Sequence, residues 1–492
     1  MGQYITDSGV LLKGYCYSTE EILGANGVGE ILCLRLETNY QCNLDCIYCY
    51  SYLRQQCNES VEMSFADACD VIDQGVALGL KSVVYLGGGE PFMYSHFWEL
   101  LEYMHSKNVV PVIFTNGMLI DKEYAHRLYN LGVSVMIKMD GLGKIQNWLT
   151  GADTYSRIHR GLENLMEAGF NKPDGRFTRL GVAPCVTMVN LHEVPDIWRF
   201  ARQNNIFPNI EKATQIGRAT SHITIGKEES QWLTKTIQDI DLNEFNIRWS
   251  SPYSSITAHS CGIFKSGLAV TVERGVALCP EMEPVANLAE VPLAEIINQP
   301  PFTVSRNIEK YIDEPCRSCE HIHICLGGCR SKALLYTGSI TGCDTFCHLV
   351  SQEDGSGAAN ACKCDVCGDC GIKFDILKLS VAAAVAQINA HIAGCPGDES
   401  SAVIAVDVSA SENAADIENI LKIHVRDDDM LIHLNEDRNT YLFVCGHCGT
   451  SVAKLLHTRL SKLLQDESRT VAVRLLETNS DINAHVLKEI LG

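Results

Sequence analysis

Three cysteines stand close together near the start of the chain, and thiolates are ligands that iron and zinc both accept. Cys42, Cys46 and Cys49 form a C-x3-C-x2-C array within the segment YQCNLDCIYCY. Three thiolates can hold three irons of a [4Fe–4S] cluster and leave the fourth iron open to a small chelating molecule. The array therefore predicts a catalytic iron–sulfur site rather than an electron store, with a zinc site as the alternative.

A glycine-rich segment follows about forty residues later. The apolar run Ser82–Leu86 predicts a short buried strand, which leads directly into Gly87, Gly88, Gly89, Glu90 and Pro91. Consecutive glycines let the backbone approach a ligand closely, because no Cβ stands in the way. An ordinary turn at the end of a strand is the alternative interpretation.

The cysteine array and the GGGEP segment together resemble the radical S-adenosylmethionine (radical SAM) enzymes. In that family the residue before the last cysteine is usually aromatic, as Tyr48 is here. The resemblance implies that Cys42, Cys46 and Cys49 hold a [4Fe–4S] cluster whose open iron binds S-adenosylmethionine. It also implies that the GGGEP segment hydrogen-bonds the methionine amino group, which makes a zinc site much less favoured.

Apolar strands and amphipathic helices alternate through the first half of the chain, which predicts βαβ units and a parallel sheet. The expected strands are Ile31–Asn39, Ser82–Leu86, Val109–Phe114, Val133–Met139, Gly181–Val189 and Phe207–Glu211, with helices at Phe65–Leu78, Phe97–Lys107 and Tyr155–Ala168. Right-handed crossovers curl such units toward a barrel. The predicted fold class is thus α/β, with a partial (β/α)6 barrel of the radical SAM kind.

Polar residues follow several of these strands, and in barrels the chemistry lies at the carboxyl ends of the strands. Lys138 and Asp140 follow one strand, and Asn190 follows the next. They are candidates to contact the nucleoside or the substrate, although each is equally compatible with an ordinary polar residue at a strand end.

A second cysteine group begins after residue 260. Its core, C-x2-C-x5-C-x3-C, resembles the SPASM extension that follows many radical SAM barrels and carries auxiliary [4Fe–4S] clusters. The resemblance assigns one cluster to Cys316, Cys319, Cys325 and Cys347, and part of another to Cys261, Cys279 and Cys329. Zinc is again the alternative.

The chain departs from the SPASM pattern in two places. Only three residues separate Gly275 from Cys279, where the family usually has four. Ser255 stands where some members supply an extra cysteine. The first auxiliary cluster is therefore expected either to have an open iron or to use Cys343 as a further ligand.

The third cysteine group, Cys362, Cys364, Cys367 and Cys370, follows the linker-like stretch SQEDGSGAAN. It predicts a further cluster or zinc, with Cys445 and Cys448 as additional candidates. From residue 374 a small α/β domain is expected, with a helix at Ile376–His391 and strands at Ala402–Val408, Met430–Leu434, Thr440–Val444 and Thr470–Leu475. Its order resembles part of a GGDEF nucleotide-cyclase domain without the signature, so cyclase activity is not expected. A ferredoxin-like accessory domain is the simpler interpretation.

Composition narrows the functional class. The chain of 492 residues carries a formal net charge of −20, which disfavours nucleic acid as a partner. Twenty-three cysteines in a chain of this length are typical of metal ligands rather than of a disulfide scaffold. The sequence has no evident secretory signal and no apolar run of the ~20 residues that a membrane span requires. A cytoplasmic location without membrane attachment is expected.

The domains expected from these patterns are an N-terminal segment 1–30, the barrel 31–240, the auxiliary iron–sulfur domain 241–350, the cysteine-containing linker 351–373 and the accessory domain 374–492. The resemblance implies an enzyme that abstracts hydrogen from a peptide or protein side chain, with an electron donor such as flavodoxin or ferredoxin. Only about thirty residues precede the barrel, which keeps small-molecule or cofactor biosynthesis as an alternative. A non-catalytic redox relay or sensor is a third hypothesis, which the intact GGGEP segment disfavours.

Overall fold

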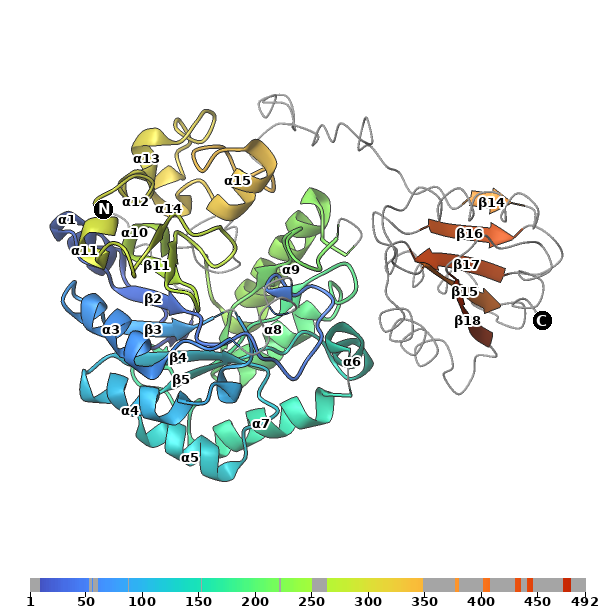
Figure 1. Ribbon diagram of the computed structural model, residues 1–492, viewed down its shortest axis with the longest axis horizontal. Helices are drawn as coiled ribbons and strands as arrows, with labels where there is room; N and C mark the ends of the chain where they lie inside the picture. Colours follow the sequence, from blue (N-terminus) through green and yellow to red (C-terminus); the bar gives the residue numbers. More distant parts are fainter. Residues whose placement is uncertain are drawn as a thin grey trace. The chain divides into compact units, whose positions relative to one another are not determined.

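The computed structural model describes residues 9–52, 55, 61–86, 88–151, 153–220, 223–249 and 263–347, and beyond them five strands between 377 and 478. The chain divides into two compact units, residues 1–363 and residues 364–492 (Figure 1). Each unit is described by itself below.

Six parallel strands form the centre of the first unit. They are β2 (Cys33–Leu36), β3 (Ser82–Tyr85), β4 (Val110–Thr115), β5 (Ser134–Ile137), β7 (Leu180–Val182) and β9 (Phe207–Pro208), and they lie side by side in this order. The structure thus confirms the predicted α/β fold with a parallel radical SAM type of core.

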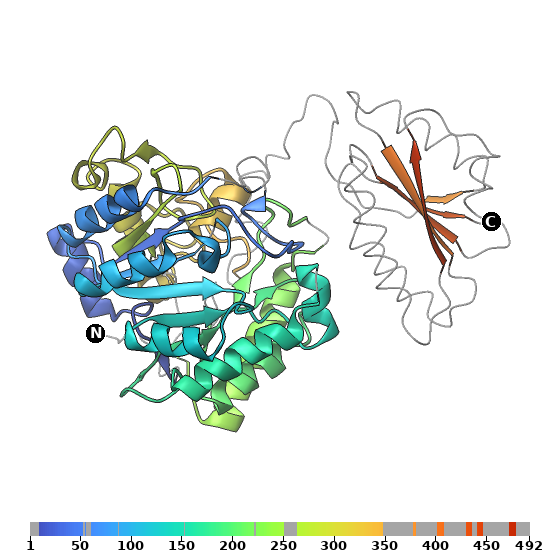
Figure 2. The ribbon, with the colours of Figure 1, turned by 60° about the horizontal axis from the view of Figure 1, so that its bottom comes forward.

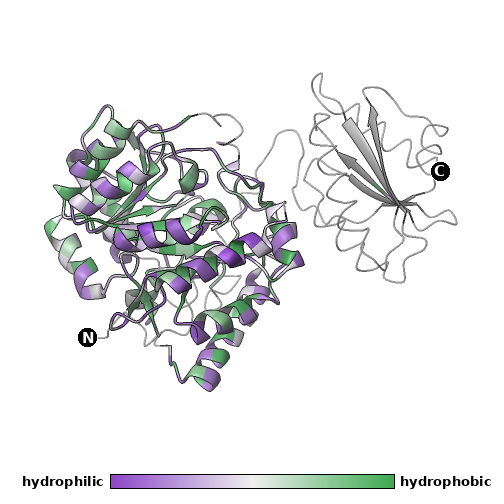
Figure 3. Ribbon diagram, turned by 90° about the horizontal axis from the view of Figure 1, so that it is seen from below, coloured by the Kyte–Doolittle hydropathy of each residue, from purple (hydrophilic) through white to green (hydrophobic). Residues whose placement is uncertain are grey.

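Helices connect each strand to the next and cover one face of the sheet (Figures 1 and 2). They are α3 (Phe65–Val76), α4 (Phe97–Ser106), α5 (Lys122–Asn130), α6 (Lys144–Thr150), α7 (Tyr155–Ala168) and α8 (Val194–Gln203), followed by α9 (Lys227–Phe245). Their apolar faces pack on the strands; in α7 these are Ile158, Leu162 and Leu165. Figure 3 shows hydrophilic and hydrophobic residues alternating along these helices, as expected of helices with one buried side. Among the described residues no helix is both long and apolar enough to cross a membrane.

Two predicted strands are interrupted, and this correction matters for the site. Residues Gly181–Val189 form β7 and then β8 (Cys185–Val186), separated by Ala183 and Pro184. Proline has no N–H to donate to a sheet, so the strand leaves the ladder there. Residues Phe207–Glu211 likewise form β9 and then β10 (Glu211–Lys212), and β8 and β10 pair in parallel away from the main sheet.

The region after residue 262 extends the same sheet. Strand β11 (Gly267–Val270) runs parallel to β2, and β12 (Gly275–Ala277) and β13 (Ala286–Asn287) continue antiparallel beyond it. The hairpin of β11 and β12 thus joins the central sheet directly. The short helix α10 (Ile263–Ser266) precedes β11. Further short helices follow β13: α11 (Leu293–Ile296), α12 (Phe302–Arg306), α13 (Ile308–Tyr311), α14 (Ile322–Cys325) and α15 (Arg330–Thr337). Outside this sheet, β1 (Leu11–Leu12) pairs with β6 (Phe177–Thr178), α1 (Thr19–Val28) precedes β2, and η1 (Pro91–Met93) follows the glycine segment.

The second unit contains a five-stranded sheet in the order β14-β16-β17-β15-β18. Its strands are β14 (Leu377–Leu379), β15 (Ser401–Asp407), β16 (Met430–Leu434), β17 (Thr440–Cys445) and β18 (Ala472–Thr478). The order and antiparallel pairing of β15 to β18 are those of a ferredoxin-like sheet. The predicted helix at Ile376–His391 is wrong at its start, because Leu377–Leu379 pairs with β16 as an edge strand. The sequence pattern also predicts helices at Ala414–His424 and Thr450–Leu464, and both lie outside the described residues. The same is true of Cys362, Cys364, Cys367, Cys370 and Cys448.

A buried carboxylate joins α8 to α9. Asp241 is fully buried and accepts hydrogen bonds from the indole N–H of Trp198 (2.7 Å), from Arg202 (2.7 Å) and from Trp249 (2.9 Å). Removing one member of a buried ion pair leaves the other charge uncompensated, which costs about 3–5 kcal/mol.

We therefore expect Asp241→Ala to lower the free energy of unfolding of the first unit by about 3–5 kcal/mol in urea titrations. The control is Asp239→Ala, whose side chain is exposed on the same helix and should change stability by less than about 0.5 kcal/mol. Equal losses in the two variants would contradict this account of the α8–α9 contact.

Candidate active site

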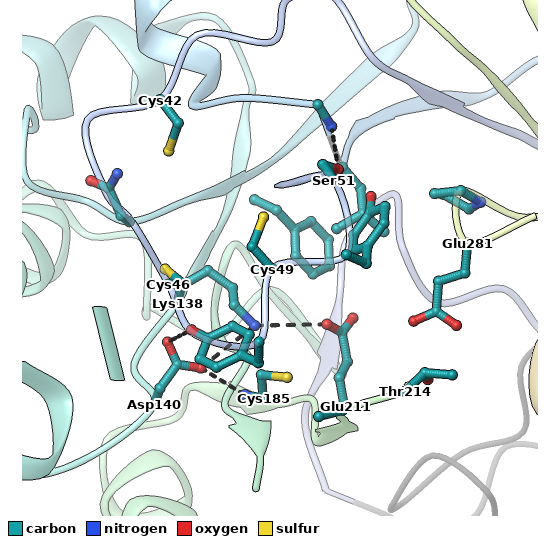
Figure 4. A pocket seen from close by; sticks show the side chains of 18 of the residues that line it. Cys42, Cys46, Cys49, Ser51, Lys138, Asp140, Cys185, Glu211, Thr214 and Glu281 are labelled. Atoms are coloured by element: carbon teal, nitrogen blue, oxygen red, sulfur yellow. Dashed lines mark hydrogen bonds and ion pairs between the residues drawn. The ribbon is translucent and has the colours of Figure 1, made fainter. Parts of the chain in front are cut away.

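One pocket gathers most of the residues that the sequence singled out. Its cavity measures about 270 Å3, and it lies where the parallel strands of the barrel end (Figure 4). Among the residues that line it are Cys42, Cys46, Tyr48, Cys49, Gly88, Gly89, Glu90, Thr115, Lys138, Asp140, Cys185, Glu211, Lys212, Thr214, Cys279, Glu281, Cys329 and Lys332. The carboxyl-end location agrees with the expectation for a barrel enzyme.

The three cysteines of the first array all face this pocket, and Figure 4 shows their sulfur atoms around one space. Burial, together with the nearby Glu90 carboxylate, raises the pKa of Cys42 to about 12. Burial and the charges of Cys49 and Cys42 likewise raise the pKa of Cys46. Buried thiols of this kind become thiolates when metal cations replace their protons, so the site suits a positively charged inorganic group.

Within the described part of the chain, no three His, Cys, Asp or Glu side chains converge on a point where one metal ion could sit. In an iron–sulfur cluster each thiolate bonds a different iron.

A segment that the sequence analysis did not identify holds the cysteine loop in place. The backbone N–H of Arg218 donates to the Cys49 carbonyl (3.0 Å), and its guanidinium forms an ion pair with Asp45. The same guanidinium lies 4.4 Å from the ring centre of Tyr52. Gly217 has a φ of +68°, and a Cβ there would overlap the Cys49 carbonyl. The position of Gly217 and Arg218 just past the last barrel strand is the only sequence signal for this role.

The glycine segment packs against the chain that leads into the cysteine loop. Gly89 N–H donates to the Asn39 carbonyl (2.7 Å), and Glu90 N–H donates to the Gln41 carbonyl (2.8 Å). Gly88 has a φ of +67°, and a Cβ at Gly88 or Gly89 would overlap these carbonyls. The two glycines are therefore required by backbone packing, while they also line the pocket. Gly87 lies outside the described residues, and Pro91 is buried at the start of η1.

The Glu90 side chain turns toward the end of β4. Its carboxylate accepts hydrogen bonds from the Thr115 hydroxyl (2.5 Å), from the Asn116 N–H (3.0 Å) and from the Phe92 N–H (3.4 Å). Burial raises the pKa of Glu90 to about 7, although these three hydrogen bonds oppose the shift. Glu90 thus ties the glycine segment to the neighbouring strand.

A chain of polar contacts crosses the floor of the pocket (Figure 4). The Tyr48 hydroxyl donates to the Asp140 carboxylate (2.5 Å), and Lys138 lies 3.6 Å from Asp140 and 3.8 Å from Glu211. Burial would lower the pKa of Lys138, but the two carboxylates raise it above its usual range. Tyr48, Lys138 and Asp140 therefore meet as one unit at the pocket.

Asn190 has a different place. It is fully buried, and its side chain donates to the carbonyls of Asp140 (2.5 Å) and Cys185 (2.9 Å) rather than lining the pocket. Its contacts hold the ends of β5 and β8 together.

Several pocket residues belong to no motif. The Cys185 N–H donates to Asp140 (2.7 Å), and burial raises the pKa of its thiol. Lys212 on β10 and Lys332 on α15 both line the pocket. Burial, and to a smaller extent the charge of Lys332, lowers the pKa of Lys212 to about 8. Burial also raises the pKa of the Glu281 carboxyl. Perturbed ionisable groups that cluster in a cleft are typical of functional sites.

The auxiliary cysteines fall into two places. Cys279 and Cys329 line the pocket, and their thiols interact electrostatically. Cys316 packs with Cys343 and Cys347. Burial and the charge of Cys347 raise the pKa of the Cys325 thiol. Cys343 therefore lies beside Cys316 and not beside Cys279. The sequence pattern instead makes Cys343 a candidate ligand of the first auxiliary cluster, to which Cys279 is assigned. Cys261 lies outside the described residues.

Residues 36–201 match the family model of the Radical SAM superfamily. The chain is 28% identical over 344 residues to the mycofactocin maturase MftC of Mycobacterium ulcerans, covering 65% of this chain and 89% of that one. It is 24% identical over 352 residues to the PqqA peptide cyclase of Gluconobacter oxydans, covering 65% and 91%. A shorter match, 30% identical over 168 residues, links it to the Fe-coproporphyrin III synthase of Methanosarcina barkeri and covers 34% and 40%.

Solved structures share the fold. Streptococcus suis SuiB bound to its precursor peptide SuiA superposes with a TM-score of 0.51 at 16% identity, over 67% of this chain and 79% of that one. The protein anSMEcpe with bound AdoMet, which is S-adenosylmethionine, gives a TM-score of 0.51 at 19% identity, over 64% and 90%.

The raised pKa of Glu90 has a consequence for stability. A carboxyl whose pKa is higher in the folded state than in the unfolded chain binds its proton more tightly when the chain is folded. The contribution of Glu90 to the free energy of unfolding is therefore fully present below about pH 4.5 and is lost as the pH rises through about 7. We expect Glu90→Gln, which removes this titration, to gain roughly 3 kcal/mol relative to the wild type between pH 5 and pH 8.

The measurement is urea unfolding of both proteins at the two pH values. Glu102→Gln, a change at an exposed position of α4, serves as the control and should follow the wild type. Parallel pH profiles for the wild type and Glu90→Gln would show that Glu90 is ionised at both pH values.

Proposed function

Because residues 36–201 belong to the radical SAM superfamily and the chain is a radical SAM enzyme, we propose that it modifies a side chain of a peptide or protein substrate. The observation that carries the proposal is the single pocket that joins Cys42, Cys46 and Cys49, the glycine segment, and the auxiliary Cys279 and Cys329. In such a pocket one substrate group can lie close both to the three cysteines of the first array and to the two auxiliary cysteines.

The relatives support a peptide substrate. The curated proteins that the chain matches along 89% and 91% of their lengths are a maturase named for mycofactocin and a cyclase named for the PqqA peptide. The match to the Fe-coproporphyrin III synthase covers only 34% of this chain, so a small-molecule substrate is the second candidate.

Cys42, Cys46 and Cys49 are the proposed ligands of the [4Fe–4S] cluster, and they fit it as buried thiols on one loop that faces a cavity. The proposed elements of the S-adenosylmethionine site are Gly87, Gly88, Gly89, Glu90 and Pro91, with Tyr48, Lys138 and Asp140. Asn190 is proposed to support this site indirectly, by holding the Asp140 backbone in place. The chemistry that this cofactor pair supplies is reductive cleavage of S-adenosylmethionine to a 5′-deoxyadenosyl radical, which abstracts hydrogen from the substrate.

The contribution of this chain's own residues is to bind, orient and shield. Arg218 fixes the cysteine loop through Cys49 and Asp45. The Tyr48–Asp140–Lys138 unit presents fixed polar groups at the pocket floor. Apolar side chains such as Leu44, Leu86 and Phe264 complete the lining and limit the entry of water.

The auxiliary clusters are proposed as follows. Cys261, Cys279 and Cys329 bind the first, next to the pocket, and Cys316, Cys319, Cys325 and Cys347 bind the second. The packing of Cys343 against Cys316 makes Cys343 a further candidate for the second cluster rather than for the first. We propose residues 31–240 as the barrel domain and residues 241–350 as the auxiliary domain.

The proposed electron donor is a low-potential protein such as flavodoxin or ferredoxin. The chain's 23 cysteines fit a reducing compartment. We therefore propose a cytoplasmic location.

The cluster assignment predicts that the triple variant Cys42→Ala, Cys46→Ala, Cys49→Ala forms no 5′-deoxyadenosine with dithionite and S-adenosylmethionine. It should also lose about four irons per chain after anaerobic reconstitution, because the sequence has no other thiol between Cys33 and Cys57. Cys69→Ala, on α3 and away from the pocket, is the control and should keep both properties. Cleavage of S-adenosylmethionine by the triple variant would refute the assignment.

The domain division predicts that truncation after Leu349 leaves a folded protein that still cleaves S-adenosylmethionine without substrate. Every barrel and auxiliary motif precedes this point, and the second unit has a sheet of its own. The truncated protein should stay in solution, keep the circular dichroism of a folded unit and form as much 5′-deoxyadenosine as the full chain. Precipitation, or loss of this activity together with all iron, would instead assign Cys362, Cys364, Cys367 and Cys370 to the core.

A further inference from the structure

Two lysines on different elements meet in the pocket, and no motif accounts for them. Lys212 belongs to β10 at the end of the barrel, and Lys332 belongs to α15 in the auxiliary region. Both line the pocket, and the charge of Lys332 disfavours the charged form of Lys212. Lys332 is only 5% exposed. Bringing two like charges out of water costs free energy unless an anion shares the site.

The protein's own carboxylates do not pair closely with these two ammonium groups. Among the described residues, neither ammonium has a carboxylate oxygen within 4.0 Å, whereas Lys138 has two. Lys212 donates to the Ser230 hydroxyl (2.6 Å), and an ammonium has three N–H donors. Lys332 lies 4.6 Å from the ring centre of Phe346.

The carboxylates that face this pair already have donors. Asp344 acts electrostatically on Lys212, but its oxygens accept the N–H groups of Cys329 (2.9 Å) and Phe346 (3.0 Å). Glu281 acts on Lys332 and also interacts with the hydroxyls of Ser331 and Thr214. The two ammonium groups therefore retain donors for a further acceptor inside the pocket.

We infer that Lys212 and Lys332 form a carboxylate-binding subsite for the substrate. This inference rests on the proposed function, and it narrows the substrate to a peptide with a carboxylate near the group that reacts. Two ammonium donors suit a carboxylate because charge-assisted hydrogen bonds can form to both of its oxygens. The carboxylate is either the C-terminal one of a peptide or that of an Asp or Glu side chain.

A different role for the same lysines is to offset the negative charge of metal-bound thiolates, because the thiols of Cys329 and Cys347 also interact electrostatically with Lys212. That role involves no substrate. It predicts a changed reduction potential of an auxiliary cluster on substitution and no change in peptide preference.

The test uses the full chain with reconstituted clusters and saturating S-adenosylmethionine. Three pools of random pentapeptides are the probes: one with a free C-terminal carboxylate and no Asp or Glu, one amidated with a single Glu, and one amidated with Gln in its place. Bound peptides are separated by ultrafiltration and quantified by mass spectrometry. The first two pools identify the source of the carboxylate, and the third is the uncharged reference.

We expect about tenfold enrichment of one carboxylate pool over the amide reference. Lys212→Met and Lys332→Met should each reduce this ratio to about one, while Lys310→Met, an exposed lysine on α13, should preserve it. No preference in the wild type, or an undiminished preference in both variants, would overturn the inference, and a shifted cluster potential alongside an undiminished preference would assign the lysines to the cluster.

Formation of 5′-deoxyadenosine, measured with dithionite in the same samples, separates this inference from the proposed function. A wild type that makes 5′-deoxyadenosine but shows no carboxylate preference refutes only the subsite. A wild type that makes none refutes the proposed function, whatever its peptide preference.

Discussion

Strand β2 occupies the position on which both halves of the site depend. It pairs in parallel with β3 on one side and with β11 on the other, so Leu36 lies opposite both Tyr85 and Val270. The cysteine loop follows β2 and the glycine segment follows β3, and their backbones pack so closely that only glycine fits at positions 88 and 89. Because β11 extends the same sheet, the turn that carries Cys279 is held next to the cysteine loop. A shift of register at β2 would separate the two sets of thiols.

The pocket itself depends on strands that stop early. Had Gly181–Val189 continued as one strand, Cys185 would have stayed in the main ladder. The interruption at Pro184 instead lets β8 pair with β10, which sets Cys185 opposite Glu211 and brings Lys212 to the pocket. Asn190 secures this departure through the carbonyls of Asp140 and Cys185. A proline and a buried amide thus create the space in which the strand-end side chains meet.

The sequence predicted local features well and long-range ones poorly. The spacing of Cys42, Cys46 and Cys49, the glycine segment and the strand–helix alternation are all encoded within short stretches, and the structure has the parallel core that they indicate. The approach of Lys212 to Lys332 and of Arg218 to Asp45 depends on chain folding over many residues, and no periodicity reports it. The helix expected at Ile376–His391 begins as an edge strand because pairing with β16 outweighs the helical pattern. The place of Cys343 beside Cys316 could not be read from spacing either, because Cys343 and Cys347 both follow the motif.

The ionisable groups of the pocket share one physical property. Burial raises the pKa of the thiols Cys42, Cys46, Cys185, Cys279 and Cys329, raises the pKa of the Glu90 and Glu281 carboxyls, and lowers the pKa of the Lys212 ammonium. Each group is therefore less stable as an ion in the pocket than it would be in water. Ligands that carry charge reverse this: iron favours thiolates, and a carboxylate favours two ammonium groups. Because the same lysines adjoin Cys329, the charge of a bound substrate and the charge of the auxiliary site act on one another through a short distance in a poorly hydrated space. An iron–sulfur cluster bound by thiolates carries net negative charge, so the proposed auxiliary group at Cys329 and the proposed substrate carboxylate would compete for the same two ammonium groups.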